Sequence, residues 1–190
     1  AIGYMHAYAN SDHENRTRDL LAARLPNLSY SISAEVCPEI REYERFTTTV
    51  ANAYVRPLMA RYLARLRDGM AAMGVDCPVL LMTSGGGLTT LENAMQFPIR
   101  LVESGPAGGA ILATKIAKEM QMDKVISFDM GGTTAKICLI GDYRPQTARE
   151  FEVDRAARFT KGSGMPLRIP VIQMVEIGAG GGSIARLDAL

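Results

Sequence analysis

An aspartate, two glycines and two threonines lie close together in the part of the sequence best suited to chemistry. Residues 129–134 read Asp-Met-Gly-Gly-Thr-Thr and directly follow an apolar run typical of a buried strand. Gly131 and Gly132 carry no Cβ, so their amides can turn inward and close around an anion such as phosphate. The hydroxyls of Thr133 and Thr134 add further donors. The motif predicts a phosphate-binding loop, and its alternative interpretation is a tight β-turn between two apolar strands.

Asp129 is the candidate catalytic residue and the candidate metal ligand. A carboxylate beside bound phosphate repels it unless a cation lies between them, and Mg²⁺ or Mn²⁺ held through oxygen ligands and water meets that need. Asp129 would then hold the metal or orient a water molecule. The loop is not a Walker A motif, because it lacks Gly-x-x-x-x-Gly-Lys, and it is not a Rossmann fingerprint, because a strand follows it instead of a helix.

A second glycine loop joins an expected strand at residues 78–83 to an expected helix at residues 89–96. It consists of Ser84, Gly85, Gly86 and Gly87. Amides at a helix N-terminus attract anions, so this loop is a candidate part of a nucleotide pocket. The alternative is a flexible connection without a ligand.

Two further glycine-rich segments carry weaker signals. Residues 104–109 begin an expected helix with small side chains, which favours close packing. Residues 178–183 form the longest glycine run, and taken alone they are typical of a mobile turn.

Composition excludes several classes of protein. The chain has 190 residues and a formal net charge of +1, so no overall field favours nucleic acid or an anionic membrane. No apolar stretch is long enough to span a bilayer. Cys37, Cys77 and Cys138 offer neither a disulfide framework nor a Cys-x-x-Cys zinc site, which fits a reducing, cytoplasmic location. Neither end resembles a natural terminus, so we expect a fragment.

The elements that must position these loops alternate between strands and helices, which predicts an α/β fold with a mostly parallel mixed sheet. Residues 47–73 are expected to form a long helical segment with a kink or boundary near Pro57. The glycine loops fall in an α/β portion at residues 78–190. There, residues 125–128 and 135–140 should pair as a hairpin. Further strands are expected at residues 2–9, 28–33, 99–102 and 171–177, and further helices after residue 12 and at 104–120.

Taken in order, several motifs together resemble the hydantoinase A / 5-oxoprolinase family, whose relatives include acetone and acetophenone carboxylases. The matching segments are residues 35–45, 82–87, 103–109, 128–133 and 176–185. The resemblance implies an actin-like (ribonuclease H-like) ATPase fold, of which residues 1–190 would be a single internal fragment. It also implies ATP with Mg²⁺ as cofactors, with Asp129, Gly131, Gly132 and Thr133 in one phosphate loop.

For function, the resemblance implies an ATP-dependent hydrolase that activates the carbonyl oxygen of a cyclic amide by phosphorylation. A hydantoinase B-like partner subunit and an oligomer are expected with it, and the fragment alone should be inactive. The alternatives are a ketone carboxylase subunit, a non-catalytic actin-like assembly module and a small-molecule kinase. Two departures stand out: an earlier Asp-x-Gly-Gly-Thr of the family is absent, and Lys136 replaces an aspartate found in some members. Lys136 would pair with phosphate or lie exposed on its strand.

Overall fold

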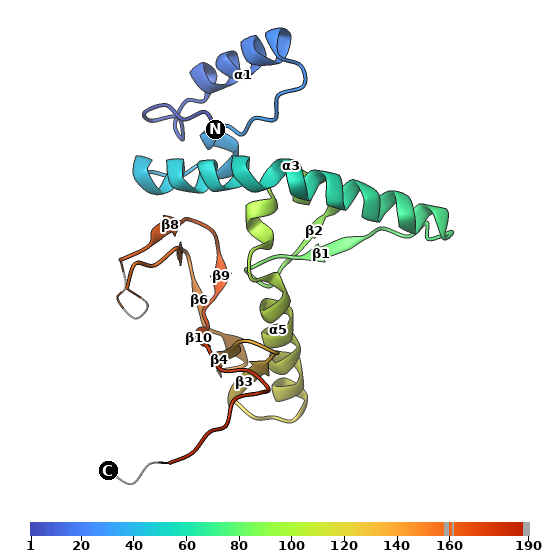
Figure 1. Ribbon diagram of the computed structural model, residues 1–190, viewed down its shortest axis with the longest axis vertical. Coiled ribbons are helices and arrows are strands. Elements are labelled where there is room, and N and C mark those ends of the chain that lie inside the picture. The colour runs from blue at the N-terminus through green and yellow to red at the C-terminus, as the bar shows by residue number, and fades with distance from the viewer. Residues whose placement is uncertain (158–159, 161, 188–190) are drawn as a thin grey trace.

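The computed structural model describes residues 1–157, 160 and 162–187. Its longest element is helix α3 (Glu42–Ala72), which lies across the molecule in Figure 1. Helices α1 (Asp12–Arg24) and α2 (Ser33–Val36) precede it, and α1 lies on the side of α3 opposite the strands (Figure 1). The predicted helices after residue 12 and along residues 47–73 are therefore present, with α3 starting earlier than expected.

Helix α3 runs through Pro57 without interruption, so the helix boundary suggested by that proline is absent. Its end follows the sequence signal. Gly74 has a φ of +79° and donates its N–H to the Ala71 carbonyl (3.0 Å), and the Val75 N–H bonds to the Met70 carbonyl (3.0 Å). Glycine adopts this left-handed conformation at little cost, which is why helices commonly end at it.

A buried polar network joins the N-terminal segment to α3. The Glu14 carboxylate accepts hydrogen bonds from the Ser33 hydroxyl (2.5 Å) and from the Ala34 N–H (2.8 Å). Arg45 donates to the Ser33 Oγ (3.1 Å) and to the Tyr4 carbonyl (2.8 Å). Glu14, Ser33 and Arg45 are all fully buried. Because each charged group has hydrogen-bond partners, the network can hold the segment against α3 without an unpaired charge.

The middle of the chain forms a hairpin and three helices. Strands β1 (Leu80–Met82) and β2 (Leu88–Thr90) pair antiparallel. They are followed by α4 (Leu91–Gln96), the 3-10 helix η1 (Pro98–Leu101) and α5 (Ser104–Glu119). The strand expected at residues 99–102 is wrong, because Pro98 starts a tight helical turn there.

The remaining strands build three small sheets. The central sheet has the order β10 (Val175–Ile177), β4 (Ala135–Gly141) and β3 (Lys124–Met130), with β5 (Arg144–Pro145) also paired to β4. Strand β6 (Thr147–Ala148) pairs with β9 (Val171–Ile172), and β7 (Phe151–Val153) pairs with β8 (Met165–Leu167).

The prediction of a mostly parallel sheet is wrong. Every pairing between the described strands is antiparallel, and the one parallel contact is an isolated bridge between Ile2 and Ile32. That bridge is all that forms of the strands expected at residues 2–9 and 28–33. The physical reason lies in the connections. Short connections join β1 to β2, β3 to β4 and β4 to β5, and connections that short can join only antiparallel neighbours. The predicted hairpin of β3 and β4 is thereby confirmed.

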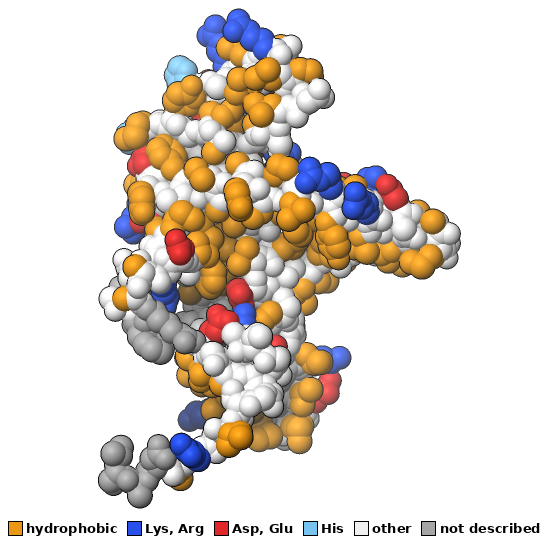
Figure 2. All heavy atoms as spheres, viewed as in Figure 1, with side chains coloured by type: hydrophobic (Ala, Val, Ile, Leu, Met, Phe, Trp, Pro, Cys, Tyr) orange, Lys and Arg blue, Asp and Glu red, His pale blue; other side chains and the backbone are white. Residues whose placement is uncertain are grey.

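The two faces of the central sheet differ. One packs against α5, where Ala107 and Ala110 are small enough to approach Cys138 and Ile140 closely. The other face carries large apolar side chains that are exposed to solvent: Ile126, Phe128, Met130, Leu139, Val175 and Ile177. Figure 2 shows hydrophobic side chains at the surface around the lower end of the molecule, where β3 and β4 lie. Within the described part of the chain, no helix is long and apolar enough to cross a membrane.

The three cysteines differ in access. Cys37 and Cys138 are buried, and this burial raises the pKa of both thiols, whereas Cys77 is exposed after the end of α3. The thiolate is the reactive form, so at neutral pH we expect iodoacetamide to alkylate Cys77 alone in the folded protein. Intact-mass spectrometry should show one adduct, none in Cys77→Ser, and three after denaturation. Equal labelling of all three thiols in the native state would contradict the described packing.

Candidate phosphate-binding site

Asp129 lies where β3 ends and its chain turns toward β4. It is opposite Lys136 in the β3–β4 ladder, and one further pair, Met130 with Ala135, closes the ladder before the turn. The Gly131 N–H donates to the Thr134 carbonyl at 3.0 Å. The motif therefore does form the tight turn that its alternative interpretation predicted. Its geometry still leaves Asp129 exposed beside the turn.

The second half of this site comes from the distant glycine run at residues 178–183. The Gly181 N–H donates to the Gly131 carbonyl at 3.0 Å. A Cβ placed on Gly180 would lie 2.1 Å from the Gly132 carbonyl oxygen and 2.7 Å from the Thr133 nitrogen. Contacts that short are not possible for a side chain, so the two loops can meet only because residue 180 is glycine. Sequence reasoning missed this juxtaposition, and the only available signal was the length of the glycine run.

Backbone donors remain available where the loops meet. Across the described residues, the amides of Gly132 and Thr133 donate no hydrogen bond. The Ser183 Oγ accepts the Gly180 N–H at 3.1 Å, which leaves its hydroxyl hydrogen free to donate outward. Successive amides in a glycine-rich turn, with a nearby hydroxyl, are a common way to bind phosphate oxygens. The arrangement therefore fits an anion.

Charged side chains surround the carboxyl end of β3. The Lys136 ammonium pairs with the Glu103 carboxylate and lies 3.9 Å from a Glu176 oxygen. Only 16% of the Lys136 side chain is exposed, so the expectation of an exposed strand lysine is wrong. Asp129 makes no hydrogen bond or ion pair within the described part of the chain, which leaves its carboxylate available to a ligand.

The described residues contain no cluster of three or more His, Cys, Asp or Glu side chains that could hold a metal ion. A metal at this place would therefore take at most two ligands of these four types from the described residues. Mg²⁺ is commonly bound in that way, through a carboxylate, water and the phosphates of a substrate. Asp129 fits the carboxylate of such a shared site.

The loop of Ser84, Gly85, Gly86 and Gly87 has a different setting. Strand β2 follows it, so the expected step from strand to helix is wrong and the loop is the turn of a hairpin. The buried Ser84 hydroxyl lies within hydrogen-bonding distance of the Arg100 (3.0 Å) and Pro170 (2.9 Å) carbonyls. Ser84 thus ties the hairpin to its neighbours. A part for this loop in a nucleotide pocket stays a prediction.

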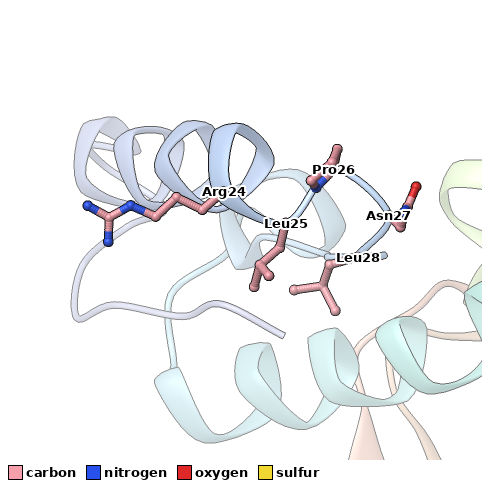
Figure 3. Close-up of a pocket in the computed structure, with 5 residues that line it drawn as sticks. All are labelled: Arg24, Leu25, Pro26, Asn27 and Leu28. Carbon is pink, nitrogen blue, oxygen red and sulfur yellow. The ribbon is translucent and has the colours of Figure 1, made fainter.

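A surface hollow at the end of α1 carries no comparable chemistry. It is lined by Arg24, Leu25, Pro26, Asn27 and Leu28, and Figure 3 shows the Leu25 and Leu28 side chains pointing toward α3 while Arg24 points away. These residues belong to the segment on the far side of α3 from β3 and β4 (Figure 1). The hollow is therefore separate from the candidate site.

Comparison with known proteins places residues 45–190 within the family model described as Hydantoinase/oxoprolinase. The chain is 35% identical to the caprolactamase subunit alpha of Pseudomonas jessenii, over 99% of its own length and 26% of that protein. It is 30% identical to the 5-oxoprolinase of Saccharomyces cerevisiae, over 97% of its own length and 13% of that protein. The chain thus spans 26% of the first of these relatives and 13% of the second.

Solved structures agree with the sequence matches. The ATP-dependent caprolactamase from Pseudomonas jessenii superimposes with a TM-score of 0.78 at 33% identity, covering 99% of this chain and 26% of that one. A nucleotide-free acetone carboxylase superimposes with a TM-score of 0.76 at 25% identity, covering 96% of this chain and 25% of that one.

Proposed function

The chain belongs to the hydantoinase/oxoprolinase family, and from this we propose that it acts within a longer ATP-dependent enzyme that hydrolyses a cyclic amide. The observation that carries the proposal is the contact of Gly180 and Gly181 with the Gly131–Thr134 turn beside Asp129. Its substrate class is supported by two relatives, a caprolactamase subunit and a 5-oxoprolinase.

In this proposal each part of the site has a task. The free amides of Gly132 and Thr133 bind phosphate oxygens, together with the hydroxyls of Thr133, Thr134 and Ser183. Asp129 holds Mg²⁺ or Mn²⁺ or orients a water molecule. Bound ATP would transfer its γ-phosphoryl group to the carbonyl oxygen of the amide and leave as ADP, which makes the carbonyl carbon a better electrophile. Water would then add to that carbon, the ring C–N bond would break with a proton passing to the nitrogen, and phosphate would leave. Catalysis of such a transfer depends mainly on positioning and charge neutralisation, which rigid backbone donors provide.

The same proposal includes the larger assembly. Residues 1–190 would be one part of an actin-like ATPase domain, whose remaining segments supply the other side of the nucleotide site. The exposed apolar face of the central sheet, which includes Phe128 and Ile126, supports this, because faces of that kind normally pack against further protein. A partner subunit of the hydantoinase B type, an oligomeric state and a cytoplasmic location complete the proposal. Residues 84–87 would border the nucleotide.

One alternative activity has a specific observation behind it. The acetone carboxylase structure is as similar in fold as the caprolactamase is, with a TM-score of 0.76. Phosphorylation of a ketone enolate would use the same phosphate loop and the same carboxylate. A ketone carboxylase subunit is therefore the second candidate function.

The test is ADP release by the intact protein that contains this chain, together with any co-encoded partner subunit, in the presence of Mg²⁺. The substrate panel comprises hydantoins, 5-oxoproline, caprolactam and acetone with bicarbonate. We expect a cyclic amide to stimulate ADP release, and we expect one molecule of ring-opened product for each molecule of ADP. Stimulation by acetone with bicarbonate, and by none of the cyclic amides, would establish the carboxylase instead. Nucleotide binding without stimulation by any compound would contradict both activities.

A further inference from the structure

Three charged residues lie side by side on neighbouring strands of the central sheet. Lys136 of β4 is directly opposite Asp129 of β3 and directly opposite Glu176 of β10. Side chains opposite one another in a ladder point to the same face of the sheet. Lys136 therefore stands in the middle of this row, between two carboxylates and close to the glycine turn.

A third carboxylate reaches Lys136 from α5. Glu103 forms an ion pair with the Lys136 ammonium and lies immediately before the first residue of α5. Its φ of +62° is left-handed, which is uncommon for residues other than glycine. The ion pair fixes the ammonium from a second direction.

The Lys136 ammonium lies near two carboxylates, those of Glu103 and Glu176. The ammonium has three donor hydrogens, and the two carboxylates occupy at most two of them. At least one hydrogen is then left without a partner among the described residues. Without Lys136, a phosphate entering beside the turn would face the carboxylates of Glu103, Asp129 and Glu176 together, and like charges at that range repel strongly. Lys136 is the one cation that the described residues place in this row.

We propose that Lys136 is a phosphate-binding residue, whose ammonium is aimed by Glu103 and Glu176 at the terminal phosphate of the nucleotide. The inference rests on the proposed function, because it needs a nucleotide phosphate at the glycine turn. Glu103 and Glu176 are positioning residues that act through Lys136.

The test measures the dissociation constant of a non-hydrolysable ATP analogue with Mg²⁺ by calorimetry, and the melting temperature, on the intact protein. Lys136→Met should raise the dissociation constant about 10-fold or more, since charge-assisted bonds to phosphate are among the stronger polar contacts. Lys136→Arg should stay within a few-fold of the wild type. Glu103→Gln should cause a smaller loss, because Glu176 still positions Lys136 and one carboxylate that repels phosphate is removed.

Two double variants separate binding from folding. Lys136→Met with Glu103→Gln removes both charges of the pair, so no unpaired carboxylate is left at Glu103. This variant keeps the test usable if Lys136→Met alone does not fold. It too should bind the ATP analogue weakly. The charge swap Glu103→Lys with Lys136→Glu should recover the melting temperature but not the affinity. Recovery of affinity by the swap, or unchanged affinity in Lys136→Met, would overturn the inference.

Failure of the inference is distinguishable from failure of the proposed function. If the wild type binds the analogue and Asp129→Asn does not, while Lys136→Met binds normally, only the role of Lys136 is wrong. If the wild type does not bind the analogue at all, the proposed function itself fails, and the inference with it.

Discussion

Replacement of Asp129 by asparagine is expected to lower Mg²⁺-dependent ATP hydrolysis by the intact protein at least about 100-fold, the loss typical when a preorganised electrostatic group is removed. Asparagine keeps the size of the side chain but not its charge, so it cannot balance a divalent cation. The fold should not change, because Asp129 is exposed and has no partner among the described residues. Steady-state ADP release and the melting temperature measure the two effects.

A matched control is available at the other end of the same sheet. Asp142 is also exposed and lies in the turn between β4 and β5 with a φ of +49°, a conformation that asparagine tolerates well. Asp142→Asn should leave ADP release unchanged. If Asp129→Asn keeps half or more of the wild-type rate, Asp129 has no part in the mechanism.

Gly180→Ala is expected to force the two glycine loops apart. Its Cβ would collide with the Gly132 carbonyl carbon, 2.4 Å away, and backbone atoms on both sides would have to move. Overpacking of this kind costs about 1–3 kcal/mol of stability. Because the displaced atoms carry the free donors of the site, nucleotide affinity should fall more than stability does. Calorimetry with the ATP analogue and thermal unfolding measure both.

Gly182→Ala is the control for this variant. A Cβ on Gly182 meets nothing within 4 Å, although the residue belongs to the same loop. We expect wild-type stability and affinity in Gly182→Ala. If Gly180→Ala behaves in the same way as Gly182→Ala, the described contact between the loops does not exist in solution.

Local signals in the sequence predicted the elements that local interactions determine. The periodic apolar residues of α3, the proline in the first turn of α5 and the short turn between β3 and β4 each specify structure through neighbours in sequence. Strand direction failed because it depends on distant partners. Ile2, for example, has the residue type of a strand, yet among the described residues it pairs through a single bridge to Ile32.

The candidate site divides in the same way. Asp129 and its glycine turn were predictable from six consecutive residues. The approach of Gly180 to this turn was not predictable, because it requires β10 to pair with β4, and strands β5 to β9 lie between these two in the sequence. The glycines themselves do not distinguish a ligand loop from a packing loop. A Cβ on Gly86 would lie 2.8 Å from the Ile111 side chain, so glycine at this position permits close packing. Its φ of +82° is a second reason for glycine here, because other residues rarely adopt that conformation.

The central claim is that the Gly131–Thr134 turn and the Gly180–Ser183 loop, with Asp129, form one phosphate-binding site. A crystal structure of the intact protein with Mg²⁺ and a non-hydrolysable ATP analogue tests it directly. We predict phosphate oxygens within hydrogen-bonding distance of the Gly132 and Thr133 amides, and the metal beside Asp129. A nucleotide bound elsewhere, with these amides facing only water, would contradict the claim.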